Sequence, residues 1–293
     1  MQFQGLFKDK SYFSKIGILL LLVFISVIFH VAIFIVLTMI FSDGNLSVIQ
    51  NQDLTNQTSV NYLKLVQLLT GLGLFIVPIL LHAYLVDYKF KFNSISRQSI
   101  LLVITIIMLI TPFISLLLEW NMQIPFPDWI LAFENNSEVI IEAFLKMDGF
   151  WDLLYTLLVM AIVPAIWEEL IFRGYLQQIA YNWLRNPHVA ILIIAFLFSA
   201  IHFHIEAIIP RFFLGVLLGY LYYWSKSLWL PILAHFVNNA QAVIFAYPLF
   251  KVDGGIYSLV SKNKVDPMLA LFSFFSVLLL LYLLQKNLNT KKD

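Results

Sequence analysis

The sequence contains no cysteine, and only 12% of its 293 residues are charged. Without cysteine the chain can form no disulfide, thiolate metal site, cysteine nucleophile or lipidated cysteine anchor. The formal net charge is +1, and no basic run is long enough to form a phosphate-binding tail. The composition therefore gives no indication of nucleic-acid binding. The share of charged residues is also well below that of a soluble domain.

Apolar residues are abundant instead, making up 61% of the chain and giving it a mean hydropathy of +0.86. This composition is typical of a protein that crosses a membrane several times. The long apolar runs predict an all-α polytopic fold with about eight transmembrane helices. The predicted spans are residues 16–41, 63–86, 100–118, 150–184, 189–203, 208–224, 228–249 and 267–284.

The distribution of Lys and Arg predicts which ends of the spans face the cytoplasm. One side of the predicted topology, which includes both termini, carries 12 of these residues, and the other side carries 6. We therefore expect an integral membrane protein with both termini in the cytoplasm. The first apolar run is too long for the core of a cleavable signal peptide, so we expect it to remain as a span.

The chain shows no sequence repeat and no separate soluble domain, so its polar motifs define the expected domains. Residues 1–149 are expected to form three spans and a surface helix at 137–147, where apolar residues recur at helical spacing. Residues 150–249 are expected to form a catalytic core of four spans. Residues 250–293 are expected to form the last span and a basic tail.

The predicted fourth span contains Glu168, Glu169 and Arg173 in an otherwise apolar helix. A carboxylate in hydrocarbon is costly unless it is paired or used. Glu169 and Arg173 are four residues apart, so they share a helix face and can form an ion pair. Glu168 lies about 100° around the helix and lacks this partner. Glu168 is therefore the carboxylate available for chemistry.

Further polar residues, including His202, His235 and Asn239, lie in the apolar runs that follow. If spans four and five form a hairpin that turns near Asn186, Glu168 and His202 lie about 27 Å and about 24 Å from the turn at 1.5 Å per residue. Their side chains can therefore meet inside the bilayer. His235 and Asn239 are four residues apart and share a face of the seventh span.

A carboxylate, two imidazoles and a carboxamide in one dry cavity suit the hydrolysis of a peptide bond. Glu168 and His202 can hold and deprotonate a water that attacks a carbonyl carbon. His235 and Asn239 can donate hydrogen bonds to the oxyanion that forms, and such donors are usually the largest catalytic contribution.

Three spaced motifs in this region resemble those of the CAAX-processing protease and bacteriocin-processing family, also called Abi. The motifs are Glu168-Glu169-xxx-Arg173, Phe198-xxx-His202 and His235-xxx-Asn239. They occur in the family's order on successive predicted helices, and the resemblance covers about residues 150–245. It implies an eight-helix intramembrane glutamic endopeptidase similar to the type II CAAX prenyl endopeptidases.

The resemblance also implies a role for each motif residue. Glu168 and His202 would activate water, and His235 and Asn239 would form the oxyanion hole. No metal cofactor is implied. The substrate would be a peptide or protein met at the lipid bilayer and able to be membrane-anchored. Prenylated C-termini, bacteriocin leader peptides and self-immunity all fit, and nothing in the sequence chooses among them.

Several alternatives stay open. Two histidines with one or two glutamates can bind zinc and leave a position for water, although the chain lacks the HExxH spacing of helical zinc proteases. A non-catalytic scaffold or immunity factor could share the fold. A proton-coupled transporter fits less well, because the chain has no internal duplication. Glu169 and Arg173 can also be a purely structural ion pair, and Asn238 can face a neighbouring helix.

Overall fold

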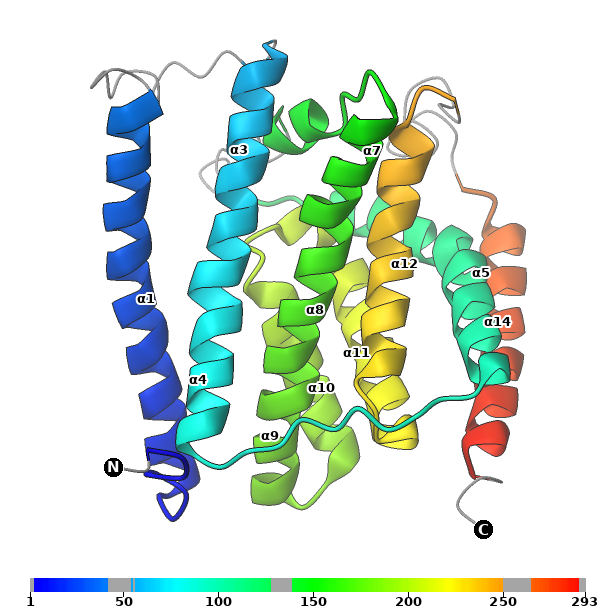
Figure 1. Ribbon diagram of the computed structural model, residues 1–293. Helices are drawn as coiled ribbons and strands as arrows, with labels where there is room; N and C mark the ends of the chain where they lie inside the picture. Colours follow the sequence, from blue (N-terminus) through cyan, green and yellow to red (C-terminus); the bar gives the residue numbers. More distant parts are fainter. Residues whose placement is uncertain (1–2, 42–53, 55, 128–138, 250–264, 290–293) are drawn as a thin grey trace. The chain divides into compact units, whose positions relative to one another are not determined.

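The computed structural model describes residues 3–41, 54, 56–127, 139–249 and 265–289. Contacts divide the chain into two compact units, Met1–Phe90 and Lys91–Asp293 (Figure 1). Among the described residues, seven helices are long and apolar enough to cross a membrane, and α10 (Pro187–Ala200) is a shorter apolar helix. These segments overlap the predicted spans, which confirms the all-α, multi-pass membrane fold. The division at residues 149 and 249 stays a prediction.

The described part of the first unit contains two helical runs. They are α1 (Tyr12–Phe41) and the continuous series α3 (Gln57–Thr70), η1 (Gly71–Ile76) and α4 (Val77–Leu85). A polar contact joins the two runs, because His30 Nε2 lies 2.8 Å from the Thr70 hydroxyl. That hydroxyl donates to the Val66 carbonyl at 2.7 Å, so it accepts from His30. The histidine in the first span is therefore bound by a neighbouring helix.

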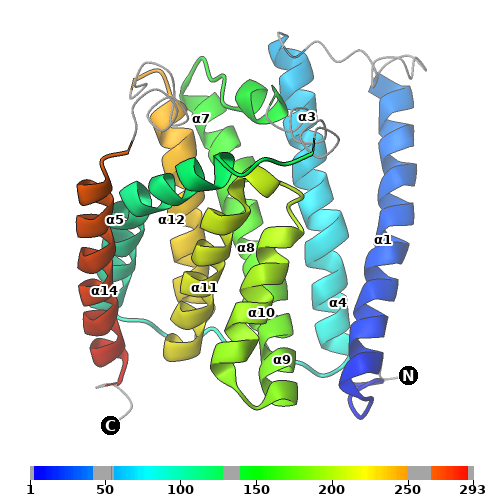
Figure 2. The same cartoon turned by 180° about the vertical axis from the view of Figure 1, so that it is seen from behind.

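The second unit contains the remaining helices. They are α5 (Arg97–Met122), α7 (Phe150–Leu157), η2 (Leu158–Ile162), α8 (Val163–Glu169), η3 (Leu170–Leu176), α9 (Gln177–Leu184), α10, η4 (Ile205–Ala207), α11 (Ile208–Ser225), α12 (Trp229–Ala246) and α14 (Pro267–Asn289). Helix α14 lies along α5, and α10 lies along α11, in both views (Figures 1 and 2). Residues 139–144 are helical, within the expected surface helix, and residues 137 and 138 lie outside the described part of the chain.

Residues 150–184 form one continuous helical run, as the sequence predicts. The stretches η2 and η3 within it are π-helical turns, a form that is often found at functional sites. The run ends where Arg185 adopts a left-handed conformation with φ of 55°. Asn186 then caps α10 by accepting from the backbone N–H groups of His188 and Val189. The turn at Asn186 sends α10 back beside the run, which is the predicted hairpin.

Two glycines let α11 approach α10 closely. A Cβ atom on Gly219 would lie 2.8 Å from Ile191 Cγ2, and one on Gly215 would lie 3.0 Å from the Cα atom of Ala195. A side chain at position 219 would force a shift of its neighbours, and one at position 215 would require the α10 backbone to give by a few tenths of an ångström. The close approach also exposes the carbonyl groups of Gly215 and Gly219 to side chains from the fourth span, as described below.

We expect Gly215→Leu to destabilise the fold by roughly 1–3 kcal/mol, because the added side chain must push α10 and α11 apart. Thermal unfolding of the purified protein in detergent measures this loss. Gly17→Leu is the matched control, because a Cβ atom on Gly17 in α1 would meet nothing within 4 Å. An equal change in the two variants would contradict the close packing of α10 on α11.

Candidate active site

The paired glutamates lie at the end of α8, and Arg173 lies in the π-helical turn that follows. All three are buried, with Glu168 5% exposed and Glu169 and Arg173 fully covered. Arg173 Nη1 donates to Glu169 Oε1 at 2.7 Å, so the predicted ion pair forms. The sequence therefore indicated correctly which of the two carboxylates is paired and which faces elsewhere.

Arg173 is held on further sides as well. Its Nη2 donates to the Gly215 carbonyl at 3.1 Å. Its guanidinium carbon lies 4.4 Å from the centre of the Phe198 ring, a cation–π contact. One turn later, Gln177 Nε2 donates to the Gly219 carbonyl at 3.1 Å. Two polar side chains of the fourth span therefore bind two glycine carbonyls of α11, and this anchors the helix that carries the glutamates.

His202 lies just beyond the end of α10, in the turn before η4. This corrects the expectation that the fifth span continues to residue 203, because the helix ends at Ala200 and Phe203 is left-handed with φ of 50°. His202 Nδ1 lies 2.7 Å from the Phe198 carbonyl oxygen, which can only accept, so Nδ1 carries a proton. In the neutral ring, Nε2 therefore presents a lone pair.

The lone-pair side of His202 faces Glu168. The distance from His202 Nε2 to Glu168 Oε2 is 3.7 Å. The predicted approach of the Glu168 and His202 side chains is therefore seen in the structure. The His202 side chain is 29% exposed and that of Glu168 is 7% exposed, so the histidine is the more accessible of the pair.

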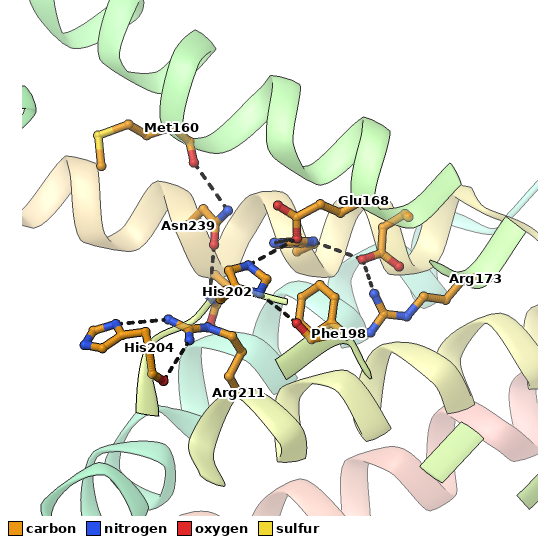
Figure 3. A network of polar contacts seen from close by, with 11 residues as sticks. Met160, Glu168, Arg173, Phe198, His202, His204, Arg211 and Asn239 are labelled. Carbon is orange, nitrogen blue, oxygen red and sulfur yellow. Dashed lines mark hydrogen bonds and ion pairs between the residues drawn. The ribbon is translucent and has the colours of Figure 1, made fainter. Parts of the chain in front are cut away.

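His235 approaches Glu168 from α12. Its Nδ1 lies 3.0 Å from Glu169 Oε1, an oxygen that also accepts from Arg173, so Nδ1 is the donor. Its Nε2 lies 3.8 Å from Glu168 Oε2. Glu168 therefore faces the Nε2 atoms of two imidazoles at nearly equal distances, both longer than a direct hydrogen bond. Figure 3 shows Glu168 and His202 of this group.

Asn239 lies one turn after His235 on α12, and Figure 3 shows it in the same view as Glu168 and His202. Its Nδ2 donates to the carbonyl of Met160 at 3.3 Å. Its Oδ1 accepts from Asn238 Nδ2 at 3.1 Å. Since a carbonyl only accepts, the amide orientation is determined, and one Nδ2 proton remains for another acceptor. Asn238 therefore binds its neighbour on the same helix, and it also lines the cavity described below.

Phe198 is a member of the site that residue chemistry alone did not indicate. Its ring is 1% exposed and contacts the His202 and His235 rings edge-on, with centroid distances of 5.1 and 5.7 Å. It also lies under Arg173, and its carbonyl accepts from His202. A phenylalanine in a membrane helix carries no chemical signal of its own, and its spacing from His202 in the Phe198-xxx-His202 motif is what identifies it.

A cavity of about 340 Å³ lies between α5, α11 and α12. Asn238 and Arg211 are among its lining residues, and the rest of the lining is mainly apolar. Arg211 Nη1 donates to the carbonyl of His204 at 3.4 Å and so contacts the turn that carries His202 (Figure 3). The cavity is therefore next to the cluster of Glu168 and His202, on the side of Asn238.

Metal ligation needs several donor side chains that point to one spot. Within the part of the chain that the structure describes, no group of three or more His, Asp or Glu side chains is arranged to hold a metal ion. The distances from Glu168 to the two imidazoles suit groups that share a small molecule between them. Absence of a metal cofactor stays a prediction, and experiment must choose between it and the zinc alternative.

Comparisons with known proteins agree with the motifs. Residues 150–241 match the model of the family described as type II CAAX prenyl endopeptidase Rce1-like. The matched range includes every motif residue from Glu168 to Asn239. The match confirms the resemblance and points to a membrane protease. No curated protein and no solved structure matches the chain.

Proposed function

We propose that the Rce1-like core of this protein is an intramembrane endopeptidase that uses Glu168 and His202 to activate water. The observation that carries the proposal is the position of Glu168 Oε2, buried and facing His202 Nε2 at 3.7 Å and His235 Nε2 at 3.8 Å. Ionisable residues within membrane helices are rare and are usually functional. Here a second carboxylate, Glu169, already serves the structural ion pair.

In the proposed reaction a water donates one hydrogen bond to the Glu168 carboxylate and one to His202 Nε2. Glu168 takes a proton from the water while the water oxygen bonds to the peptide carbonyl carbon. This produces a tetrahedral oxyanion. The protonated Glu168 then gives this proton to the peptide nitrogen, and the carbon–nitrogen bond breaks. The products are a carboxyl group and an amine, and Glu168 returns to its carboxylate form.

The two predicted oxyanion donors differ in whether a proton is already available for the oxyanion. Asn239 has an Nδ2 proton left after its bond to Met160, so it can donate without further change. His235 donates its Nδ1 proton to Glu169, so Nε2 can donate only when the ring carries a second proton. Asn239 is therefore the primary oxyanion donor in this proposal, and loss of one such donor typically costs about 10²–10³ in kcat.

The substrate in this proposal is a peptide or protein held at the bilayer. The family name specifies CAAX prenyl endopeptidases, so a prenylated C-terminal peptide is the first substrate to test. The seven helices among the described residues that are long and apolar enough to cross a membrane agree with catalysis on a membrane-anchored chain. Bacteriocin leader peptides remain a second substrate class to test.

We expect His202→Ala to lower peptide hydrolysis by about 10²–10⁴-fold, because the water loses one of the two groups that hold it. The assay incubates purified protein in detergent with prenylated CAAX peptides and a mixed peptide library, and mass spectrometry detects new termini. His188→Ala is the control, because His188 pairs with Tyr220 at the start of α10. Full activity of folded His202→Ala protein would refute the mechanism.

The same assay separates the metal-free mechanism from the zinc alternative. We expect hydrolysis to be unchanged after treatment with a strong chelator and dialysis. Loss of turnover that added zinc restores would overturn the metal-free mechanism, while the assignment as a hydrolase would stand.

A further inference from the structure

Pro164 is at the start of α8, directly after the π-helical turn η2. At the four-residue spacing of α8 the N–H of residue 164 would bind the carbonyl of Met160, although the last bond of η2, from the Val163 N–H to the Leu158 carbonyl, still spans five residues. Proline has no N–H, so this bond cannot form. The Met160 carbonyl instead accepts from Asn239 Nδ2 at 3.3 Å. An acceptor that a helix normally uses internally therefore serves a side chain from α12.

This contact determines how the Asn239 amide is turned. The Met160 carbonyl can bind only Nδ2, and Asn238 Nδ2 binds Oδ1 at 3.1 Å. The amide is therefore held at both ends, with its second Nδ2 proton left for the reaction. If the Met160 carbonyl returned to its own helix, only the bond from Asn238, a side chain on the same helix, would remain.

We propose that Pro164 is a positioning residue for Asn239. By withholding an N–H from Met160, it leaves that carbonyl to bind Asn239 and to direct the second Nδ2 proton at the oxyanion. The effect on turnover rests on the proposed function. The contact itself does not depend on any activity.

The chain provides a matched control for the general effects of such a proline. Pro78 is at the start of α4, directly after the π-helical turn η1, and in both places the proline follows a valine. The contacts that define the site all lie in the second unit, whereas Pro78 belongs to the first. A role limited to helix shape predicts similar effects at the two prolines. A positioning role predicts a loss of turnover at Pro164 alone.

We expect Pro164→Ala to lower kcat by about 10- to 100-fold with KM nearly unchanged, because misplacement of a catalytic group lowers the rate steeply. The thermal midpoint should not fall, because alanine is the better helix former. Pro78→Ala should leave kcat unchanged. Adding Pro164→Ala to Asn239→Ala should cause no further loss, since both changes remove the same interaction. Unchanged kcat in Pro164→Ala, or additive losses in the double variant, would overturn the proposal.

A second measurement tests the contact without any substrate. The side-chain amide signals of ¹⁵N-asparagine-labelled protein in detergent include that of Asn239, which the Asn239→Ala variant identifies. We expect this signal to move upfield in Pro164→Ala and to stay in place in Pro78→Ala. An unmoved signal in Pro164→Ala would overturn the proposal. If the wild-type protein cleaves no peptide, the proposed function fails, and this measurement still decides whether Pro164 positions Asn239.

Discussion

Replacing Glu168 with glutamine is expected to lower peptide hydrolysis by about 10²–10⁴-fold, the usual contribution of a positioned general base. The amide has nearly the same shape as the carboxyl group but cannot accept the proton of the attacking water. Glu168 contacts the two imidazoles at 3.7 and 3.8 Å without a direct hydrogen bond, so the fold should tolerate the change. Hydrolysis is measured by the appearance of new peptide termini, and folding by thermal unfolding in detergent.

Glu142→Gln is the control for this prediction, because Glu142 is exposed in the short helix at residues 139–144. Its hydrolysis rate should equal that of the wild type. Folded Glu168→Gln protein with wild-type activity would remove Glu168 from the mechanism. A cellular phenotype that persists in a Glu168→Ala strain would instead favour the non-catalytic scaffold or immunity factor.

Replacing Arg173 with methionine is expected to destabilise the protein by about 3–5 kcal/mol, the usual cost of removing one partner from a buried ion pair. Arg173 and Glu169 are both fully covered, and the bond between them is 2.7 Å long. Two partners of the Glu169 carboxylate are described above, Arg173 and His235. Without the guanidinium, only His235 of these two remains. Thermal unfolding of the purified variant gives the measurement, with exposed Arg97→Met as the control.

The double variant Glu169→Leu with Arg173→Met separates the structural role of this pair from its effect on the reaction. Replacing both charged partners with apolar residues is often close to neutral for stability. We therefore expect the double variant to be more stable than Arg173→Met alone. Its rate of peptide hydrolysis should be lower than that of the wild type, because His235 Nδ1 loses the Glu169 oxygen that holds the ring. Recovery of both stability and activity would show that Glu169 does not orient His235.

The spans and the meeting of Glu168 with His202 could be predicted because each depends on simple periodicity. Apolar runs of span length require helices, and residues at similar distances from one turn of a hairpin lie at similar depth. A carboxylate in such a helix is energetically costly, so its presence indicates a structural or functional role. The ion pair of Glu169 with Arg173 follows from their spacing alone.

Other parts of the site could not be predicted because their signals are not chemical. The sequence marks Phe198 only by its spacing in the Phe198-xxx-His202 motif, and the contacts of its ring with three charged or aromatic neighbours could not be predicted from that spacing. The bond from Asn239 to Met160 involves a backbone carbonyl, whose availability depends on a proline in another helix. The end of α10 at Ala200 depends on the left-handed turn at Phe203, which an apolar run does not reveal.

The paired bonds from Arg173 and Gln177 to the carbonyls of Gly215 and Gly219 also fix the register between two parallel helices. Donors and acceptors are both spaced by four residues, so a slip of one helical turn would keep only one pair matched. The displaced donor would then face position 211 or 223, where an arginine or a tyrosine occupies the space that glycine leaves open. The two hydrogen bonds thus select one alignment of the helices among those that apolar packing alone would permit.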